Sequence, residues 1–143
     1  MRNLARAFLA FGLISAATAT PLFAQGAKKS AQLELARQAD KLKPGEWVLK
    51  PEVAPSGPVL VYVDLTRQRA TVYRNGVRIG VSTISSGKDG HETPTGVFTI
   101  LEKNKEHISR KYNDAPMPYQ QRLTWGGVAL HAGGLPGYPE SHG

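Results

Sequence analysis

The sequence predicts a mainly β protein, arranged as a sandwich or barrel, with one short helix near the N-terminus. Three observations support this fold class: short β-rich runs punctuated by Gly and Pro, an Asn75-Gly76 pair between two of these runs, and no long helical pattern among them. Asn and Gly accept the positive φ angles of a type I′ turn, so this pair predicts a hairpin. Strands at this spacing are typical of all-β domains. The predicted strands are 59–63, 70–73, 77–82, 96–101 and 127–131.

The first residues have the composition of a secretory signal peptide. Arg2 and Arg6 form a positive segment, and the 13-residue apolar run 7–19 follows them. That run is too short to cross a membrane but has the usual length of a signal-peptide core. We expect cleavage after Ala24, so that 1–24 is removed and the remainder is exported to the periplasm or cell envelope. The alternative is an uncleaved N-terminal anchor, which also predicts export.

Residues 25–58 are predicted to form a helix and a linker before the β domain. The helix is expected within 26–45, with Ser30 as a candidate N-cap and Pro44-Gly45 as its end. We expect this helix to pack loosely and to act as a spacer. The Pro-rich stretch 50–58 predicts an extended linker. The apolar positions of the helix are Leu35, Ala39 and Leu42.

The composition fits one modest domain of 143 residues and limits the classes of partner and site. The formal net charge is +7, but Lys and Arg are scattered and never form a run of five. This pattern indicates a general attraction to polyanions, such as an anionic cell envelope, and predicts no nucleic-acid groove. Because the chain has no cysteine, it has no disulfide framework and no cysteine-type metal site.

Two long polar segments, 85–95 and 104–124, are predicted to be loops. Loops of this length in a small β domain are usually lids or binding loops. The alternative for each segment is a disordered surface excursion. The two segments are therefore the places where we expect ligand contacts.

Three stretches in this order resemble the L,D-transpeptidase catalytic domain, the YkuD domain. They are GKDGHETPTGVF at 87–98, MPYQQRLTWGGVALHAG at 117–133 and SHG at 141–143, and the resemblance covers 59–143. In that family a cysteine nucleophile and a final strand follow the SHG. The resemblance therefore implies a β domain that is incomplete at its C-terminus, and a chain that is inactive and of low stability as given.

The resemblance also implies roles for residues at the end of the chain. His131, after the apolar strand and before a Gly-rich loop, is the candidate base that activates the thiol, and its ring is expected to be oriented by a backbone carbonyl near residue 132. His142 and Gly143 are expected to shape the tight turn and oxyanion hole around the nucleophile. Ser141 is expected to hold this turn through side-chain-to-backbone bonding.

Three further residues are candidate substrate contacts. Tyr119 and Arg122 lie in the 117–133 stretch, and the Arg122 guanidinium is suited to bind a substrate carboxylate bidentately. His91 lies in a loop that borders the catalytic face in the family. The alternative for His91 is a solvated loop side chain, and His91 with Glu92 does not form an HExxH metal motif.

The function predicted from the sequence is an exported L,D-transpeptidase that acts on peptidoglycan stem peptides through a thioacyl-enzyme. The resemblance implies no metal and no organic cofactor, and it implies association with the cell wall. Two alternatives are a non-catalytic peptidoglycan-binding module and a zinc-dependent peptidase. The zinc peptidase would use His91, His131 and His142 as ligands.

Overall fold

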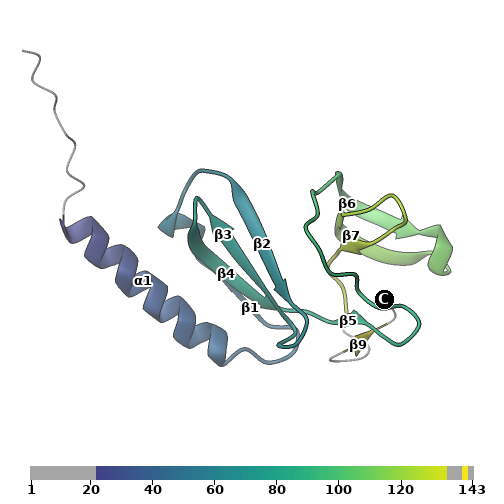
Figure 1. Cartoon of the computed structure of the whole chain (residues 1–143), viewed down its shortest axis with the longest axis horizontal. Helices are drawn as coiled ribbons and strands as arrows, with labels where there is room; N and C mark the ends of the chain where they lie inside the picture. The colour runs from purple at the N-terminus through teal and green to yellow at the C-terminus, as the bar shows by residue number, and fades with distance from the viewer. Residues whose placement is uncertain (1–21, 135–139, 142–143) are drawn as a thin grey trace, which may run out of the picture.

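The described part of the chain folds into one α-helix, two antiparallel sheets and a short parallel pair of strands (Figure 1). The computed structural model describes residues 22–134 and 140–141. The four-stranded sheet lies between the helix and the second, three-stranded sheet in the view of Figure 1. The prediction of a mainly β protein with a helix near the N-terminus is confirmed.

The helix α1 (Leu22–Asp40) begins four residues before the predicted range 26–45 and ends five residues before its end, and it is packed against the four-stranded sheet. Its residues after Gly26 are good helix formers such as Ala, Lys, Gln, Leu and Glu. Ser30 lies inside this helix, so its prediction as the N-cap is wrong. Leu35 is only 1% exposed, so the expectation of loose packing is wrong as well. No helix in the described part of the chain is both long and apolar enough to cross a membrane.

The four-stranded sheet has the order β1-β4-β3-β2 and is antiparallel throughout. The turn between β3 and β4 contains Asn75 and Gly76 at φ 51° and 72°, as the type I′ prediction required. Strand β1 lies between the predicted helix and linker and was not predicted, because it is only three residues long. The linker contains the short 3-10 helix η1. The bounds are β1 Trp47–Leu49, η1 Pro51–Val53, β2 Val59–Asp64, β3 Arg69–Arg74 and β4 Val77–Thr83.

The three-stranded sheet has the order β6-β7-β8 and corrects two predictions. The predicted strand 96–101 has no regular structure, and the predicted loop 104–124 instead forms most of the β6–β7 hairpin. Strand β6 is mainly charged and polar, so it lacks the apolar alternation by which a strand is recognised. The bounds are β6 Glu102–Ser109, the 3-10 turn η2 Arg110–Tyr112, β7 Ala115–Arg122 and β8 Ala129–Leu130.

A short parallel pair, β5 (Ser86–Gly87) and β9 (Glu140–Ser141), joins the loop after β4 to the C-terminal segment. In Figure 1 this pair lies below the three-stranded sheet. It brings residues more than fifty positions apart in sequence into register, Ser86 with Glu140 and Gly87 with Ser141.

The apolar core lies between α1 and the four-stranded sheet. The described residues of the three-stranded sheet contribute no buried apolar side chain, and its buried positions are the polar Ser109 and Gln120. The opposite face of the four-stranded sheet remains open, with Trp47 67% exposed. The buried apolar residues are Leu35, Ala39, Ala54, Ala70, Ile79 and Val81.

Candidate active site

His131 follows β8 directly and has an exposed side chain. Its Nδ1 lies 2.9 Å from the carbonyl oxygen of Ala132. A carbonyl oxygen can only accept a hydrogen bond, so the proton of the neutral ring is on Nδ1 and Nε2 keeps its lone pair. This geometry favours the Nδ1–H tautomer of His131, in which Nε2 is the basic nitrogen, and the acceptor is a backbone carbonyl at residue 132, as the resemblance implied.

The backbone after His131 is held by the neighbouring strand. The N–H of Ala132 donates to the carbonyl oxygen of Pro118 on β7 at 2.8 Å. The next residue of β7, Tyr119, has a left-handed backbone with φ 57° and a side chain that is 64% exposed. Tyr119 therefore directly follows Pro118, the residue whose carbonyl oxygen binds the segment after His131.

Arg122 also lies on β7 but is already engaged in an ion pair. Its Nε donates to Glu102 Oε2 at 2.9 Å, across the β6–β7 pair. The Arg122 side chain is mostly buried, whereas Glu102 is partly exposed. Glu102 therefore competes with any substrate carboxylate for the guanidinium of Arg122.

The loop after β5 is closed by contacts around Gly87. The Gly87 N–H donates to Thr93 Oγ1 at 2.8 Å, and a β-carbon at Gly87 would overlap the carbonyl oxygen of His91. His91 itself has an exposed side chain in this loop. The structure gives His91 a backbone role in the loop, through the N–H that donates to the Lys88 carbonyl at 2.8 Å.

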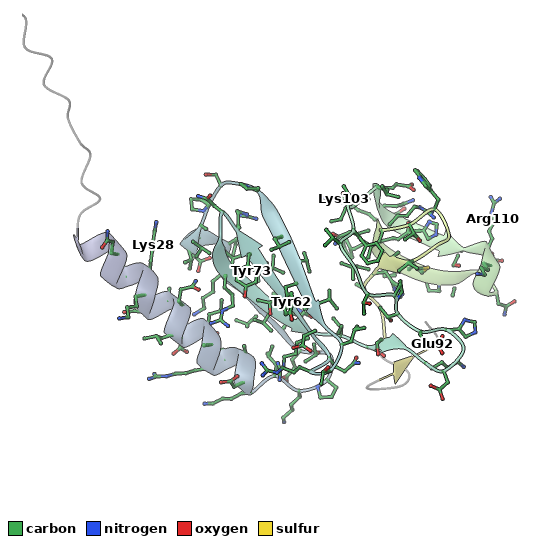
Figure 2. All side chains as sticks on the ribbon, in the orientation of Figure 1. Lys28, Tyr62, Tyr73, Glu92, Lys103 and Arg110 are labelled. Carbon is green, nitrogen blue, oxygen red and sulfur yellow. The ribbon has the colours of Figure 1, made fainter. Side chains whose placement is uncertain are left out.

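Glu92 is a charged group on the same loop (Figure 2). The Gly90 N–H donates to Glu92 Oε1 at 2.9 Å. This backbone hydrogen bond, helped by the N–H of Glu92 itself, holds the pKa of the carboxyl below its ordinary value of 4.5. The loop therefore presents a carboxylate that is ionised at neutral pH.

Of the three C-terminal candidate residues, the structure describes only Ser141. The backbone of Ser141 pairs with Gly87, so residue 141 lies beside the loop that carries His91. His142 and Gly143 lie outside the described residues, and their predicted roles stay predictions. Within 22–134 and 140–141, no group of three His, Asp or Glu residues is placed to hold a metal ion.

Two features of this site were not predicted from the sequence. One is the left-handed backbone at Tyr119, for which an aromatic residue gives no signal. The other is Gln120, whose side chain is 2% exposed and whose Oε1 has no hydrogen-bond partner. A polar residue in a run of polar residues gives no sign that it will be buried.

Comparison with known proteins identifies the family. The model of the YkuD family, the L,D-transpeptidase catalytic domain, matches residues 58–143. The chain is similar to the crystal structure of an L,D-transpeptidase (Yku) from Stackebrandtia nassauensis, with 28% identity and a TM-score of 0.53. That match covers 78% of this chain and 53% of the other, so this chain spans about half the length of that protein. No curated protein matches the chain. From the family match over more than half of its length, this chain belongs to the YkuD family of L,D-transpeptidase catalytic domains.

Proposed function

We propose that this chain is the part of an L,D-transpeptidase that binds peptidoglycan stem peptides and supplies the general base, His131. The observation that carries this proposal is the 2.9 Å contact between His131 Nδ1 and the Ala132 carbonyl, within the segment that matches the family. The contact leaves Nε2 as the basic atom, as a thiol-activating imidazole requires.

The proposed reaction has two acyl-transfer steps. His131 Nε2 removes the proton of a cysteine thiol, and the thiolate attacks the carbonyl carbon of an L,D peptide bond of the donor stem. The C–N bond breaks, the proton passes from the imidazolium to the leaving amine, and a thioester forms. An acceptor amine then attacks the thioester while Nε2 takes its proton, and the thiol is regenerated.

The thiol in this reaction is not one of the 143 residues, because they contain no cysteine. We therefore propose that these residues alone bind the donor stem without turning it over. The second candidate function is a non-catalytic module that binds peptidoglycan through this surface. The two candidates share the binding step and differ only in whether a nucleophile is present in the natural protein.

The test compares this chain with the product of its uninterrupted reading frame. Each is incubated with a stem tetrapeptide and a labelled D-amino acid, and exchange of the terminal residue is followed by mass spectrometry. We expect exchange by the reading-frame product, a loss of about 10⁴-fold or more for His131→Gln, and no such loss for the control His107→Gln on β6. Exchange by the 143-residue chain itself would overturn the thiol mechanism, and binding without exchange by both proteins would favour the binding module.

We also propose that residues 1–24 direct export to the periplasm or cell envelope, where the substrate is found. The positive segment followed by the 13-residue apolar run 7–19 supports this. Fusion of the chain to a reporter that is active only after export tests the proposal. Loss of reporter activity on deletion of 2–24 is expected, and full activity after that deletion would overturn it.

A further inference from the structure

Tyr119 occupies a backbone conformation that its side chain disfavours. Its φ is 57°, in the left-handed region, although it lies within strand β7. For a bulky residue this is an uncommon and costly conformation, and such residues cluster at functional sites, where surrounding contacts hold them in place. A glycine would adopt it freely, so the tyrosine at this position needs a structural explanation.

The explanation lies in the pairing of β7 with the chain that carries His131. In this ladder the Leu123 N–H donates to the Val128 carbonyl at 2.8 Å, and Gln121 pairs with Leu130 two residues further along. Hydrogen-bonded pairs of an antiparallel ladder recur every second residue, so the next would join Tyr119 to Ala132.

The bond is instead displaced by one residue. The Ala132 N–H donates to the carbonyl oxygen of Pro118, at 2.8 Å, so that Pro118 and Tyr119 together lie opposite Ala132. The β6–β7 ladder keeps one register on both sides of this point, with Asn104 opposite Gln120 and Glu106 opposite Pro118, so the extra residue is confined to the side of β7 that faces β8. An arrangement in which two residues of one strand lie opposite one residue of its partner, with one of the two in a left-handed conformation, is a β-bulge. Bulges are common beside active sites, where they change the direction of a side chain.

The bulge acts on the peptide unit that orients the candidate base. Ala132 is held through its N–H by Pro118, and its carbonyl oxygen accepts from His131 Nδ1 at 2.9 Å. We propose that Tyr119 is a positioning residue whose left-handed backbone, through Pro118 and Ala132, fixes the tautomer of His131. This proposal rests on the proposed role of His131 and deepens it.

The neighbouring residue supports a constraint on this bulge. Gln120 directs its side chain inward, 2% exposed, and its Oε1 has no hydrogen-bond partner. A buried amide oxygen without a partner is rare in folded proteins and unfavourable. Two adjacent residues that each break a local rule, next to the anchor of His131, are what a position selected for function is expected to show.

Tautomer measurement by NMR tests the proposal on the 143-residue chain. Ring nitrogen shifts, at a pH where the imidazole is neutral, distinguish Nδ1–H from Nε2–H, and His131→Gln assigns the signal. We expect Nδ1–H in the unchanged chain, in Tyr119→Phe and in Tyr119→Gly, since glycine keeps the left-handed backbone without a side chain. In Tyr119→Val, whose β-branched side chain disfavours that backbone, we expect Nε2–H to dominate and the Ala132 amide to exchange about tenfold faster or more.

A second variant removes the same hydrogen bond, between the Ala132 N–H and the Pro118 carbonyl, by changing its donor. Ala132→Pro keeps the carbonyl that faces His131 but removes the N–H that binds Pro118, so it is expected to lose the Nδ1–H tautomer as Tyr119→Val does. The proposal is overturned if those of the variants Tyr119→Val and Ala132→Pro that fold retain the Nδ1–H tautomer. It is also overturned if Tyr119→Gly loses that tautomer. Because no turnover is measured, failure here is separate from failure of the exchange assay, which tests the proposed function.

Discussion

Gly87 and Ser141 are direct partners in the parallel β5–β9 pair. This pairing fixes the C-terminal segment against the loop that holds His91 and Glu92, although the partners are separated by most of the matched domain. The backbone of Gly87 also lies close to the carbonyl oxygen of His91. This contact depends on the absence of a side chain at position 87, because a β-carbon there would overlap that oxygen. The loop and the C-terminal segment therefore share one small anchoring point.

Gly87→Ala is expected to open this anchoring point. The loop backbone has to move to admit the methyl group, which breaks the bond from the Gly87 N–H to Thr93 and costs about 1–3 kcal/mol. Hydrogen exchange at Ser141 and thermal unfolding measure the loss. Gly126→Ala is the matched control, since its β-carbon would meet only Thr124 Oγ1 at an ordinary 3.7 Å. Unchanged protection of Ser141 in Gly87→Ala would contradict this account.

Gln120→Met is expected to raise stability by about 1 kcal/mol. Methionine has a similar length and removes a buried amide oxygen that has no partner, so the cost of burying that oxygen disappears. Chemical denaturation compares this variant with Gln121→Met, a half-buried neighbour that should change little. A clear destabilisation by Gln120→Met would show that the amide has a partner in solution.

Leu35→Ala is expected to cost about 2–5 kcal/mol in the free energy of unfolding. The side chain is 1% exposed and lies where α1 packs against the four-stranded sheet. Leu33→Ala, on the exposed side of the same helix, is the control and should cost far less. If the two variants melt alike, α1 is not part of the cooperative fold.

The loop is expected to loosen in acid through Glu92. Its pKa is lowered chiefly by the Gly90 N–H, so the charged form is favoured in the folded loop. A lowered folded pKa means that this contribution is complete above the ordinary pKa of 4.5 and is lost as the pH falls through the folded value. The Gly90 amide shift should titrate below pH 4.5 in the unchanged chain. It should not titrate there in Glu92→Gln, and a titration that persists in that variant would assign it to another group.

Val61→Lys is expected to reduce self-association. The Asn75 N–H bonds the Pro58 carbonyl, so by alternation along the β2–β3 ladder the backbone groups of Val61 point to the open edge of β2. Residues 59–63 of β2 carry no charge. An uncharged stretch of edge strand is a template for pairing with another chain, and a lysine there opposes such pairing. Light scattering against concentration measures the effect, with Thr71→Lys on the paired strand β3 as the comparison. Equal association of Val61→Lys and the unchanged chain would exclude this edge as the contact.

The sequence predicted the parts of the fold that carry strong local signals. The β3–β4 hairpin follows from Asn75-Gly76, whose residue types set the turn. The β6–β7 hairpin did not follow, because β6 is polar on both faces and Pro116 and Pro118 argue against a strand in β7. Its pairing is decided by the partner strand and by the η2 turn, which local propensity does not report.

The candidate site divides in the same way. His131 was identified through the resemblance of 117–133 to the family, and its position after an apolar strand and before glycines agrees with that role. The bulge at Tyr119 was not found, because left-handed backbone is expected at Gly, Asn or Asp and here it falls on an aromatic residue. The link from Gly87 to Ser141 is a two-residue pairing across a long separation, which no window of sequence shows.

The location of the core has a consequence for how the molecule opens. Every buried apolar side chain among the described residues lies on α1, on the four-stranded sheet or directly after η1. The chain around His131 is held mainly by backbone hydrogen bonds between strands. Cooperative units with few apolar contacts exchange their amides through small, frequent fluctuations. The helix and the four-stranded sheet are therefore expected to stay closed while the part of the chain around His131 opens locally, without unfolding of the whole domain.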